Sequence, residues 1–457
     1  MRVRAFLAIV LCKLLRFVSR LLHRGGTAMP GRWAQRICPG LLGILSRDVK
    51  VVVITGTNGK TTSARMIEQA FADEGKDYFA NRSGANLLSG ITTEFVMNST
   101  LSGRCRKEYA VIECDEAASV SVFPLLKPRV IVVTNLFRDQ LDRYGEVTHT
   151  LANVRTGIQG APEATLCLNA DCSLTASLAD DLPNKHVFFG IEPGACPSGE
   201  KSELSDAPHC IRCKTEYQYD FITYGHLGAF RCPSCGYCRP AADYAVTDVT
   251  EQSAEGSVIV LNAHGKSCLA QVNLPALYNV YNAAGAVAAV TEMGLGTEAG
   301  IRAIEHFKCG FGRMENFALG KAGAKMMLVK NPAGCNQVLD FLCQIKKPFA
   351  LVVCLNDRGA DGTDVSWIYD AAFEKLVDCA SYLGQLAVSG DRAADMAVRL
   401  KYAGVAPKAL HIERDYEKLV SWIDAQEVPV FIIPTYTAML ELREAVIRKV
   451  GGDEFWV

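Results

Sequence analysis

The sequence lacks a large net charge of either sign. Its 48 Lys and Arg residues nearly cancel its 49 Asp and Glu residues, so no overall electrostatic field favours nucleic acid as a partner. It also lacks the polar composition of disordered chains, because 49% of its residues are hydrophobic. At 457 residues, the chain is expected to form two or three domains, each with its own core.

The chain has no apolar run long enough to span a bilayer. A short run near the N-terminus begins like a signal peptide, but Lys13 and Arg16 interrupt it and no small-residue cleavage site follows. These basic residues recur at helical spacing opposite Leu14, Phe17 and Leu21, which predicts an amphipathic basic helix. We expect this helix to pack onto the domain that follows. The alternative is weak attraction to an anionic membrane surface.

Cysteine is abundant, with 18 residues in a chain that has no convincing export signal. Thiols in such a chain indicate a reducing compartment, where they serve as metal ligands or as small core residues. We therefore expect a cytoplasmic protein that at most makes peripheral contact with the inner face of the membrane.

Residues 51–62 read as a strand, a glycine-rich loop and the start of a helix. Such a loop binds phosphate because its backbone N–H groups converge at the helix N-terminus, where the helix dipole favours anions. A basic residue of the loop neutralises phosphate, and the hydroxyl that follows it can ligate Mg²⁺. The general P-loop pattern has a Gly where this chain has Ile54. The residues predicted to bind a nucleoside triphosphate are Thr57, Asn58, Gly59, Lys60, Thr61 and Thr62.

The stretch of residues 109–116 reads as a second apolar strand that ends in the carboxylates of Glu113, Asp115 and Glu116. Acidic residues at the carboxyl end of a strand, in a sheet whose first loop binds a triphosphate, are placed to hold Mg²⁺. A solvated acidic loop is the alternative.

Residues 190–243 break the alternation of strands and helices and contain two Cys-x-x-Cys pairs, 18 residues apart. This spacing predicts a zinc ribbon, in which each pair supplies two thiolates to a closed, structural Zn²⁺ site. Cys238 is a competitor for the fourth position. We interpret the aromatic residues between the pairs as a small core and not as a nucleic-acid surface. The predicted ligands are Cys210, Cys213, Cys232 and Cys235.

After residue 313, strands at 325–330, 349–355, 385–389 and 428–433 alternate with helical stretches such as 336–346 and 392–401. This alternation predicts a Rossmann-like α/β domain with a parallel sheet covered on both faces. Residues 356–370 follow the second of these strands and carry four aspartates and a Trp. They lie at the edge where open α/β sheets bind ligands, although a solvated loop is the alternative.

Thr-Gly-Thr-Asn-Gly-Lys-Thr-Thr resembles the variant P-loop of the Mur ligase superfamily, the ATP-dependent enzymes of cell-wall peptide synthesis and folate polyglutamylation. Later segments follow in the superfamily's order. Glu113 matches its magnesium-binding Glu, and Asn279 stands in the helix start that contacts adenine, where an N-cap role is the alternative. Arg313 matches the hinge Arg that reaches the nucleotide. Gln140 replaces a metal-binding His, which puts a second metal position in doubt.

The resemblance implies four regions along the chain. We expect an N-terminal helix and lead-in over residues 1–48, a central ATP-binding domain over 49–312 and a C-terminal α/β domain over 313–457. The zinc ribbon is an insertion in the central domain at about residues 194–243.

The C-terminal region departs from ordinary Mur ligases. Where those enzymes carry Asp-x-Tyr-Ala-His-x-Pro beside the incoming amino acid, this chain has Lys-Asn-Pro-Ala-Gly at 330–334. Together with the Cys₄ insertion and the Asp-Gly-x-Asp-x-Ser-Trp loop at 361–367, this segment resembles the MurT family over nearly the whole chain. MurT proteins are the synthetase subunits of lipid II isoglutaminyl synthase and pair with the glutaminase GatD.

This resemblance implies that ATP phosphorylates the α-carboxylate of D-isoglutamate in the lipid II stem peptide. Ammonia from glutamine, released by the partner, then gives D-isoglutamine. Lys60 and Glu113 would act on the phosphoryl group. An Asp of the C-terminal domain would orient the partner's catalytic His. We predict Asp364 for this role, with Asp361 and Asp357 as alternatives.

Two other functions remain open on the sequence. The chain could be a Mur-type amino acid ligase, as in cyanophycin or folylpolyglutamate synthesis, although the missing Tyr-Ala-His segment speaks against this. It could also be a non-catalytic, nucleotide-gated interaction module. The replacement of a metal-binding His by Gln140 is compatible with this alternative, because it could reduce catalysis.

Overall fold

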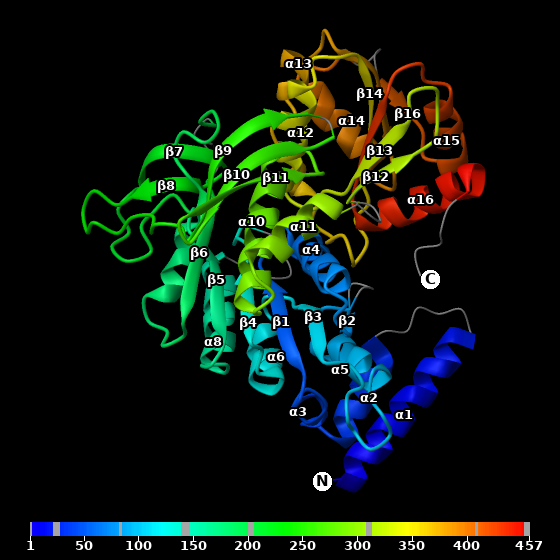
Figure 1. The fold of residues 1–457 in the computed structure, drawn as a ribbon. Helices are drawn as coiled ribbons and strands as arrows, with labels where there is room; N and C mark the ends of the chain where they lie inside the picture. Colours follow the sequence, from blue (N-terminus) through cyan, green and yellow to red (C-terminus); the bar gives the residue numbers. More distant parts are fainter. Residues whose placement is uncertain are drawn as a thin grey trace.

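Two α/β units, each built on its own sheet, make up most of the protein (Figure 1). The computed structural model describes residues 2–21, 28–81, 85–138, 147–199, 205–253, 255–307, 313–406 and 410–451. Strands of the first sheet lie between residues 50 and 272, and those of the second lie between residues 313 and 434. The predicted α/β class with largely parallel sheets is confirmed.

The first sheet has nine strands in the order β11-β10-β9-β6-β5-β4-β1-β3-β2. The seven strands from β9 to β2 are parallel, and β10 and β11 extend the sheet as an antiparallel pair. Because β1 lies between β3 and β4, the order reverses beside β1, which is where ligands bind in such sheets. The strands are β1 (Lys50–Thr55), β2 (Tyr78–Ala80), β3 (Tyr109–Glu113), β4 (Val130–Val133), β5 (Thr165–Asn169), β6 (His186–Ile191), β9 (Tyr244–Gln252), β10 (Ser257–Ala263) and β11 (Lys266–Val272).

Helices cover both faces of this sheet, which explains why β1 and β4 are runs of buried Val and Ile. On one side α4 (Lys60–Asp73), α10 (Leu277–Glu292) and α11 (Thr297–His306) pack against one another. In a second group, α6 (Ser119–Leu126) packs on α8 (Val147–Gln159), while α2 (Ala28–Ile37) and α3 (Leu41–Leu45) pack on α5 (Leu88–Met97). The short helices α9 (Ser173–Ala176) and η1 (Ser177–Ala179) follow β5.

The predicted N-terminal helix is α1 (Arg2–Leu21), and it packs on α2 and α5 as expected, but not through the apolar row that the sequence marked. Leu14, Phe17 and Leu21 are 56%, 66% and 68% exposed. Lys13, predicted on the opposite and solvated face, instead donates a hydrogen bond to Ser99 O at 2.8 Å. The largest apolar side chains therefore did not indicate the packing face of α1, because small residues let α1 approach its neighbouring helices more closely. Among the described residues, no helix is both long and apolar enough to cross a membrane.

The ribbon protrudes from the first unit between β6 and β9, at the left of Figure 1. Its hairpin consists of β7 (Gln218–Tyr224) and β8 (Leu227–Arg231), which pair antiparallel. Tyr217, Phe230 and Tyr237 pack with two of the predicted metal-binding cysteines into a separate small core. This packing agrees with the interpretation of the aromatic residues as core.

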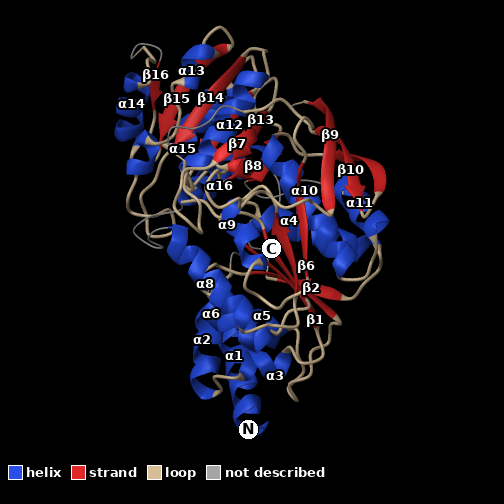
Figure 2. Ribbon diagram, turned by 90° about the vertical axis from the view of Figure 1, so that its left-hand side faces the viewer, coloured by secondary structure: helices blue, strands red, loops and turns tan. Residues whose placement is uncertain are grey.

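The C-terminal unit is a six-stranded sheet in the order β12-β13-β17-β14-β15-β16, parallel except for β12. Helices lie on both of its faces, and Figure 2 shows this unit above the first. The strands are β12 (Arg313–Phe317), β13 (Ala324–Met327), β14 (Phe349–Cys354), β15 (Leu383–Ser389), β16 (Leu410–Ile412) and β17 (Val430–Pro434). The helices are α12 (Pro332–Gln344), η2 (Ser366–Tyr369), α13 (Lys375–Asp378), α14 (Ala393–Tyr402), α15 (Tyr416–Asp424) and α16 (Tyr436–Val450).

Candidate functional site

The loop between β1 and α4 lies at the point where the strand order reverses. Gly56 and Gly59 have φ angles of 118° and 88°, a region that favours glycine. A Cβ at Gly59 would lie 2.0 Å from Asn282 Oδ1, and one at Gly56 would lie 2.3 Å from Thr134 Oγ1. The two glycines therefore let neighbouring elements approach the loop closely. Because the loop ends at the N-terminus of α4, its N–H groups and the helix dipole can hold phosphate.

Lys60 begins α4, and its ammonium group is buried next to the loop. Its Nζ donates to Gly56 O at 2.5 Å and to Glu116 Oε1 at 2.7 Å. The side chains of Lys60 and Glu116 are only 11% and 7% exposed, so this ion pair is largely desolvated. The sequence named Glu116 among three carboxylates but did not single it out as the partner of Lys60. A phosphate group entering the loop can replace this carboxylate beside the ammonium group.

Thr61 and Glu113 meet at the carboxyl end of β3. Thr61 Oγ1 donates a hydrogen bond to Glu113 Oε2 at 3.0 Å. Asn81 fixes the strand end, because its Nδ2 donates to Glu113 O at 2.8 Å and its Oδ1 accepts from Glu113 N at 2.9 Å. A hydroxyl and a carboxylate side by side are the hard oxygen ligands that Mg²⁺ prefers. These residues fit a magnesium site beside the phosphate loop.

Thr57 and Asn58 are held by residues that follow β4. Thr57 Oγ1 donates to Phe137 O at 3.1 Å and accepts from Phe137 N at 3.0 Å. Asn58 N donates to Asn135 Oδ1 at 3.0 Å, and Asn58 O accepts from Thr134 Oγ1 at 2.7 Å. Side chains and backbone groups of the protein itself therefore orient the backbone of the loop.

Asn331 links the loop to the C-terminal unit. It is 1% exposed, and its Nδ2 donates to Asn58 Oδ1 at 3.1 Å. Its Oδ1 accepts from Gly334 N at 2.9 Å and so caps α12. The sequence noted this segment only as a departure from ordinary Mur ligases, and nothing in it indicated a contact with a residue 273 positions away.

A cavity opens beside the loop, between the two units. Amide groups and apolar side chains share its walls, a mixture suited to a flat nucleotide base. The start of α10 contributes to it, but the N-cap of this helix is Ala276. The N-cap alternative for Asn279 is therefore wrong. The lining residues include Asn58, Gly59, Thr62, Leu274, Tyr278, Asn279, Asn282, Met314 and Gln337.

Asn279 and Asn282 form one amide cluster at this cavity. Asn279 Nδ2 donates to Pro275 O at 2.6 Å, and Asn282 Nδ2 donates to Asn279 Oδ1 at 3.1 Å. The Asn-x-x-Asn spacing in the sequence was the available signal for Asn282. Of the other predicted residues, Arg313 begins β12 but its side chain lies outside the described part, and Gln140 lies outside the described residues.

A second cavity of about 670 Å³ adjoins the first and shares Tyr224, Ala333 and Gln337 with it. Arg138 lies at its wall, with Nε 3.4 Å from Asp206 Oδ1 and Nη1 3.7 Å from Asp370 Oδ2 of the C-terminal unit. The volume is typical of cavities that bind small ligands. The two cavities together can hold a nucleotide and an acceptor next to each other.

The aspartates after β14 differ in their surroundings. Asp361 is 5% exposed and binds the N-terminal turn of α16, because Thr437 N donates to its Oδ1 at 2.7 Å. Asp357 lies 3.7 Å from Arg392 Nε. Asp364 is exposed, and the pKa of its carboxyl is lowered because Ser366 N donates to it at 2.8 Å. Among the three, Asp364 is best placed to reach another protein.

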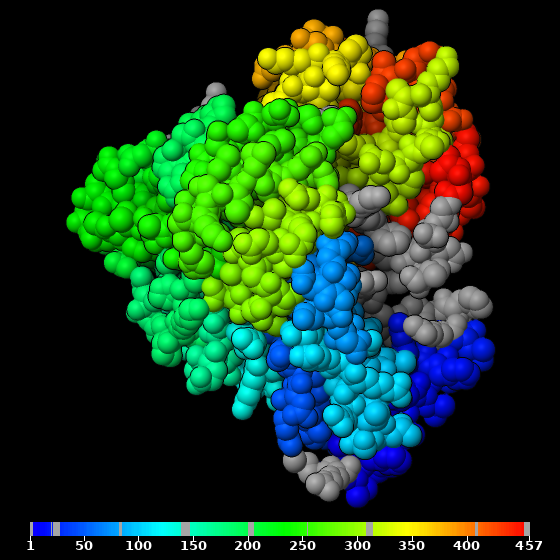
Figure 3. Space-filling model, in the orientation of Figure 1, coloured from blue at the N-terminus to red at the C-terminus, as the bar shows by residue number. Residues whose placement is uncertain are grey.

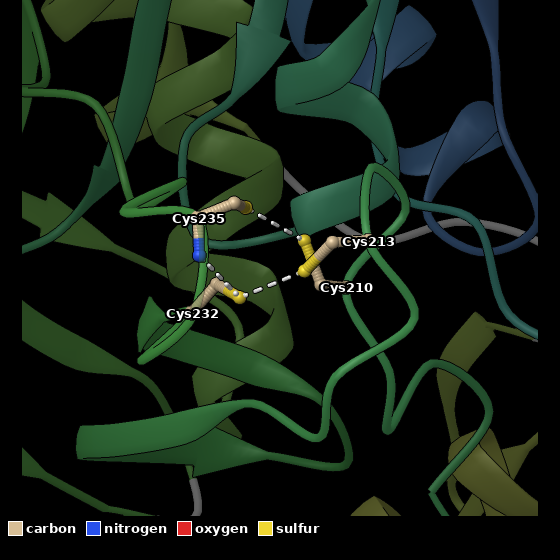
Figure 4. Close-up of side chains that lie close together, drawn as sticks. All are labelled: Cys210, Cys213, Cys232 and Cys235. Atoms are coloured by element: carbon tan, nitrogen blue, oxygen red, sulfur yellow. Dashed lines mark hydrogen bonds between the residues drawn. The ribbon is translucent and has the colours of Figure 1, made fainter.

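The structure brings the four predicted zinc ligands together, facing one another (Figure 4). Their Sγ atoms all lie within 4.8 Å of one another. The Sγ atoms of Cys210 and Cys235 are 3.5 Å apart, and those of Cys213 and Cys232 are 3.3 Å apart. Zn–S bonds of about 2.3 Å in a tetrahedron require sulfur atoms about 3.8 Å apart, so the set fits a closed Zn²⁺ site. Cys238 is exposed and stands outside this group.

Two family models match the chain. Residues 54–224 match the Mur ligase middle domain, and residues 328–439 match the MurT ligase C-terminal domain. The structure is also similar to a pseudomurein peptide ligase type C from Methanothermus fervidus, with a TM-score of 0.65 and 23% identity over 88% of this chain and 79% of the other. MurF from Acinetobacter baumannii gives a TM-score of 0.66 at 15% identity, over 92% of this chain and 81% of that one. These two neighbours share the fold.

Curated relatives match almost end to end. The MurT subunit of the glutamine-hydrolysing lipid II isoglutaminyl synthase from Streptococcus pneumoniae is 32% identical over 434 residues, 95% of each chain. The MurT subunit of the same enzyme from Staphylococcus aureus is 33% identical over 455 residues, 99% of this chain and 100% of the relative. Combined with the two family models and the Mur ligase fold, these matches establish that the chain is an ATP-dependent ligase and belongs to the MurT family.

Proposed function

We propose that this chain is the synthetase subunit of a lipid II isoglutaminyl synthase. ATP transfers its γ-phosphoryl group to the α-carboxylate of D-isoglutamate in the lipid II stem peptide, giving an acyl phosphate and ADP. Ammonia then attacks the acyl carbon, phosphate leaves, and the product is D-isoglutamine. Both MurT relatives are subunits of enzymes named for this product and for glutamine hydrolysis.

The observation that carries the proposal is the contact between Asn331 and Asn58. The Lys-Asn-Pro-Ala-Gly segment occupies the place where amino acid-adding Mur ligases are expected to hold the incoming amino acid. Here Asn331 instead contacts the phosphate loop and caps α12. Because this segment contacts the loop, it is not available to bind the side chain of an incoming amino acid. This favours ammonia as the nitrogen nucleophile, because ammonia has no side chain to be recognised.

Lys60 and the N-terminus of α4 stabilise the charge on the phosphoryl group during transfer, and the N–H groups of the loop position it. Thr61 and Glu113 would hold Mg²⁺, which supplies charge neutralisation at the phosphates when it is bound. Asn279 and Asn282 provide amide groups for the base. The second cavity, which adjoins the nucleotide cleft, is the place for the stem peptide.

The ammonia would come from a GatD-type glutaminase that docks on the C-terminal unit. The word "subunit" in the names of both relatives supports a partner chain. Asp364 is exposed and its lowered pKa keeps it ionised, as required of a group that orients a catalytic His on that partner. The Cys₄ ribbon would bind Zn²⁺ as a structural ion, because its four thiols leave no open coordination position.

The test is amidation of lipid II, followed by mass spectrometry of the stem peptide, with ATP, Mg²⁺ and a nitrogen source. Glutamine should serve only when the glutaminase is present, whereas ammonium chloride should serve with this chain alone. Asp364→Asn keeps the oxygen that accepts from Ser366 N, so the variant should fold, use ammonium chloride normally and lose glutamine use. Asp357→Asn in the same loop is the matched control and should retain both activities.

Other outcomes of this experiment would indicate a different function or a different docking residue. If a free amino acid is added to the acceptor and no amide forms, the chain is an amino acid ligase. If lipid II stimulates no ATP hydrolysis and Lys60→Ala changes nothing, the non-catalytic interaction module is the better description. If Asp357→Asn loses glutamine use and Asp364→Asn does not, the synthetase role stands but Asp364 is the wrong residue.

A further inference from the structure

The outer face of α1 exposes a row of large apolar side chains. Six of them follow the helical repeat along the whole length of the helix, with exposed fractions between 47% and 72%. Figure 3 shows this N-terminal segment in dark blue at the lower right and at the bottom of the molecule. The six residues are Val3, Phe6, Leu7, Leu14, Phe17 and Leu21.

The helix is attached to the protein by its other face. Ala5, Ala8, Ile9 and Cys12 are at most 6% exposed and pack toward α2 and α5. The helix thus uses mostly small residues for its own fold and leaves its largest apolar residues in solvent. Contiguous exposed apolar surface of this kind marks a binding site for another molecule or a membrane.

The next helix also exposes large apolar residues. Trp33 and Met29 of α2, which packs on α1, are 46% and 44% exposed. The Arg36 guanidinium lies 4.7 Å from the centre of the Trp33 ring. Trp beside Arg is suited to the boundary between lipid headgroups and acyl chains, because an apolar ring and a cation are accommodated there together.

The N-terminal segment that carries the apolar row has charge of one sign. Residues 1–47 contain nine Lys and Arg and no Asp or Glu, whereas the whole chain carries a net charge of −1, so the remaining residues carry −10. Arg4, Arg32 and Arg36 are exposed, as are Arg104 and Arg106 in the loop that Lys13 contacts at Ser99. The pKa of Lys13 is lowered by its burial and by the charge of Arg106. Positive charge therefore concentrates at the end of the protein that exposes the apolar row.

We propose that α1 and α2 dock this protein on the surface of an anionic lipid membrane. The apolar row of α1 would enter the headgroup–acyl boundary, and the surrounding Arg residues would bind lipid phosphates. A second copy of the chain fits less well, because two surfaces of this charge repel each other. The inference rests on α1 and α2 alone and does not depend on the substrate proposed above.

The test is flotation of the full-length protein with vesicles of phosphatidylglycerol or of phosphatidylcholine. Binding should be at least about tenfold tighter to phosphatidylglycerol and should weaken as salt is added. The double variant Phe6→Ser/Phe17→Ser should lose at least about tenfold of that affinity, because two large apolar groups no longer enter the lipid. Arg4→Glu/Arg36→Glu should lose the preference for the anionic lipid.

The matched control is Leu269→Ser/Ile412→Ser, which removes two apolar residues that are 66% and 53% exposed elsewhere on the surface. This control should bind vesicles like the wild type. Equal loss of binding in the control, equal affinity for both lipids, or no flotation at all would overturn the proposal. A dimer in light scattering that the Phe6→Ser/Phe17→Ser variant abolishes would instead assign the surface to a second copy of the chain. Unchanged thermal unfolding of each variant shows that the substitutions act on the surface and not on the fold.

Discussion

Glu116 offers a direct test of how the phosphate loop is held before ATP binds. Glu116→Gln preserves the size of the side chain and an acceptor oxygen but removes the charge opposite Lys60. The two side chains are 7% and 11% exposed and their charged atoms lie 2.7 Å apart, so the variant removes the carboxylate charge that faces a nearly buried ammonium group. Removing one partner of a buried pair costs about 3–5 kcal/mol. Lys60 Nζ keeps its hydrogen bond to Gly56 O, so we expect the lower end, about 3 kcal/mol.

The loss should be visible in thermal unfolding. For a domain of about 200 residues, 1 kcal/mol shifts the melting temperature by about 2–4 °C, so the variant should melt about 6–12 °C below the wild type without nucleotide. Mg²⁺ with a non-hydrolysable ATP analogue should restore much of this difference, because phosphate takes the place of the lost carboxylate. The analogue should therefore stabilise the variant more than it stabilises the wild type.

The double variant Lys60→Met/Glu116→Gln is the control. Without nucleotide it should recover part of the lost stability, because the buried ammonium group is removed together with the carboxylate charge. It should gain little from the ATP analogue, because the phosphate has lost its ammonium partner. The reasoning is refuted if Glu116→Gln and the wild type have the same melting temperature without nucleotide. It is also refuted if the ATP analogue stabilises Glu116→Gln and the wild type equally.

Three further results are expected. Purified protein should contain one Zn²⁺ per chain by elemental analysis. Cys232→Ser should lose the metal and become sensitive to proteolysis in the ribbon, whereas Cys238→Ser should keep the metal. Arg239→Met should lower the free energy of unfolding by about 3–5 kcal/mol in denaturant titrations, because it removes the partner 2.5 Å from the fully buried Asp171. Asn331→Asp should keep the cap of α12 and the melting temperature of the wild type. It should lower ATP turnover at least about tenfold, because a carboxylate oxygen replaces the amide N–H that donates to Asn58 Oδ1. Asn331→Ala should show the same loss of turnover and should also lower the free energy of unfolding by about 1 kcal/mol, because the cap of α12 is removed.

The features that were predictable from the sequence are those in which neighbouring residues determine the geometry. Gly59, Lys60 and Thr61 are adjacent in the chain, so a strand, a turn and a helix start suffice to place them. The two Cys-x-x-Cys pairs each form a local knuckle, and their joint position needed only one hairpin between them. The alternation of buried strands and helices likewise indicated parallel sheets before any contact was known.

The features that were missed depend on side-chain direction or on distant pairs. Three carboxylates lie within four residues at the end of β3, and the backbone path alone decides that Glu113 meets Thr61 while Glu116 meets Lys60. The face by which α1 packs was not evident either, because the hydrophobic pattern marks an apolar row without saying what covers it. Helical periodicity alone does not distinguish a row that contacts the core from one that remains available to an external partner.

Three distant parts of the chain converge on the phosphate loop. Asn135 orients the backbone of Asn58, Asn282 fills the space left open by Gly59, and Asn331 contacts the side chain of Asn58. Each contact comes from a different element, and the last comes from the C-terminal unit, so the loop has its full set of partners only when the two units are together. We therefore expect ATP binding to depend on the relative position of the two units, because a shift of α12 would move Asn331 away from Asn58. The proposed glutaminase, if it docks on the C-terminal unit, is expected to change the affinity for ATP through this contact without touching the nucleotide.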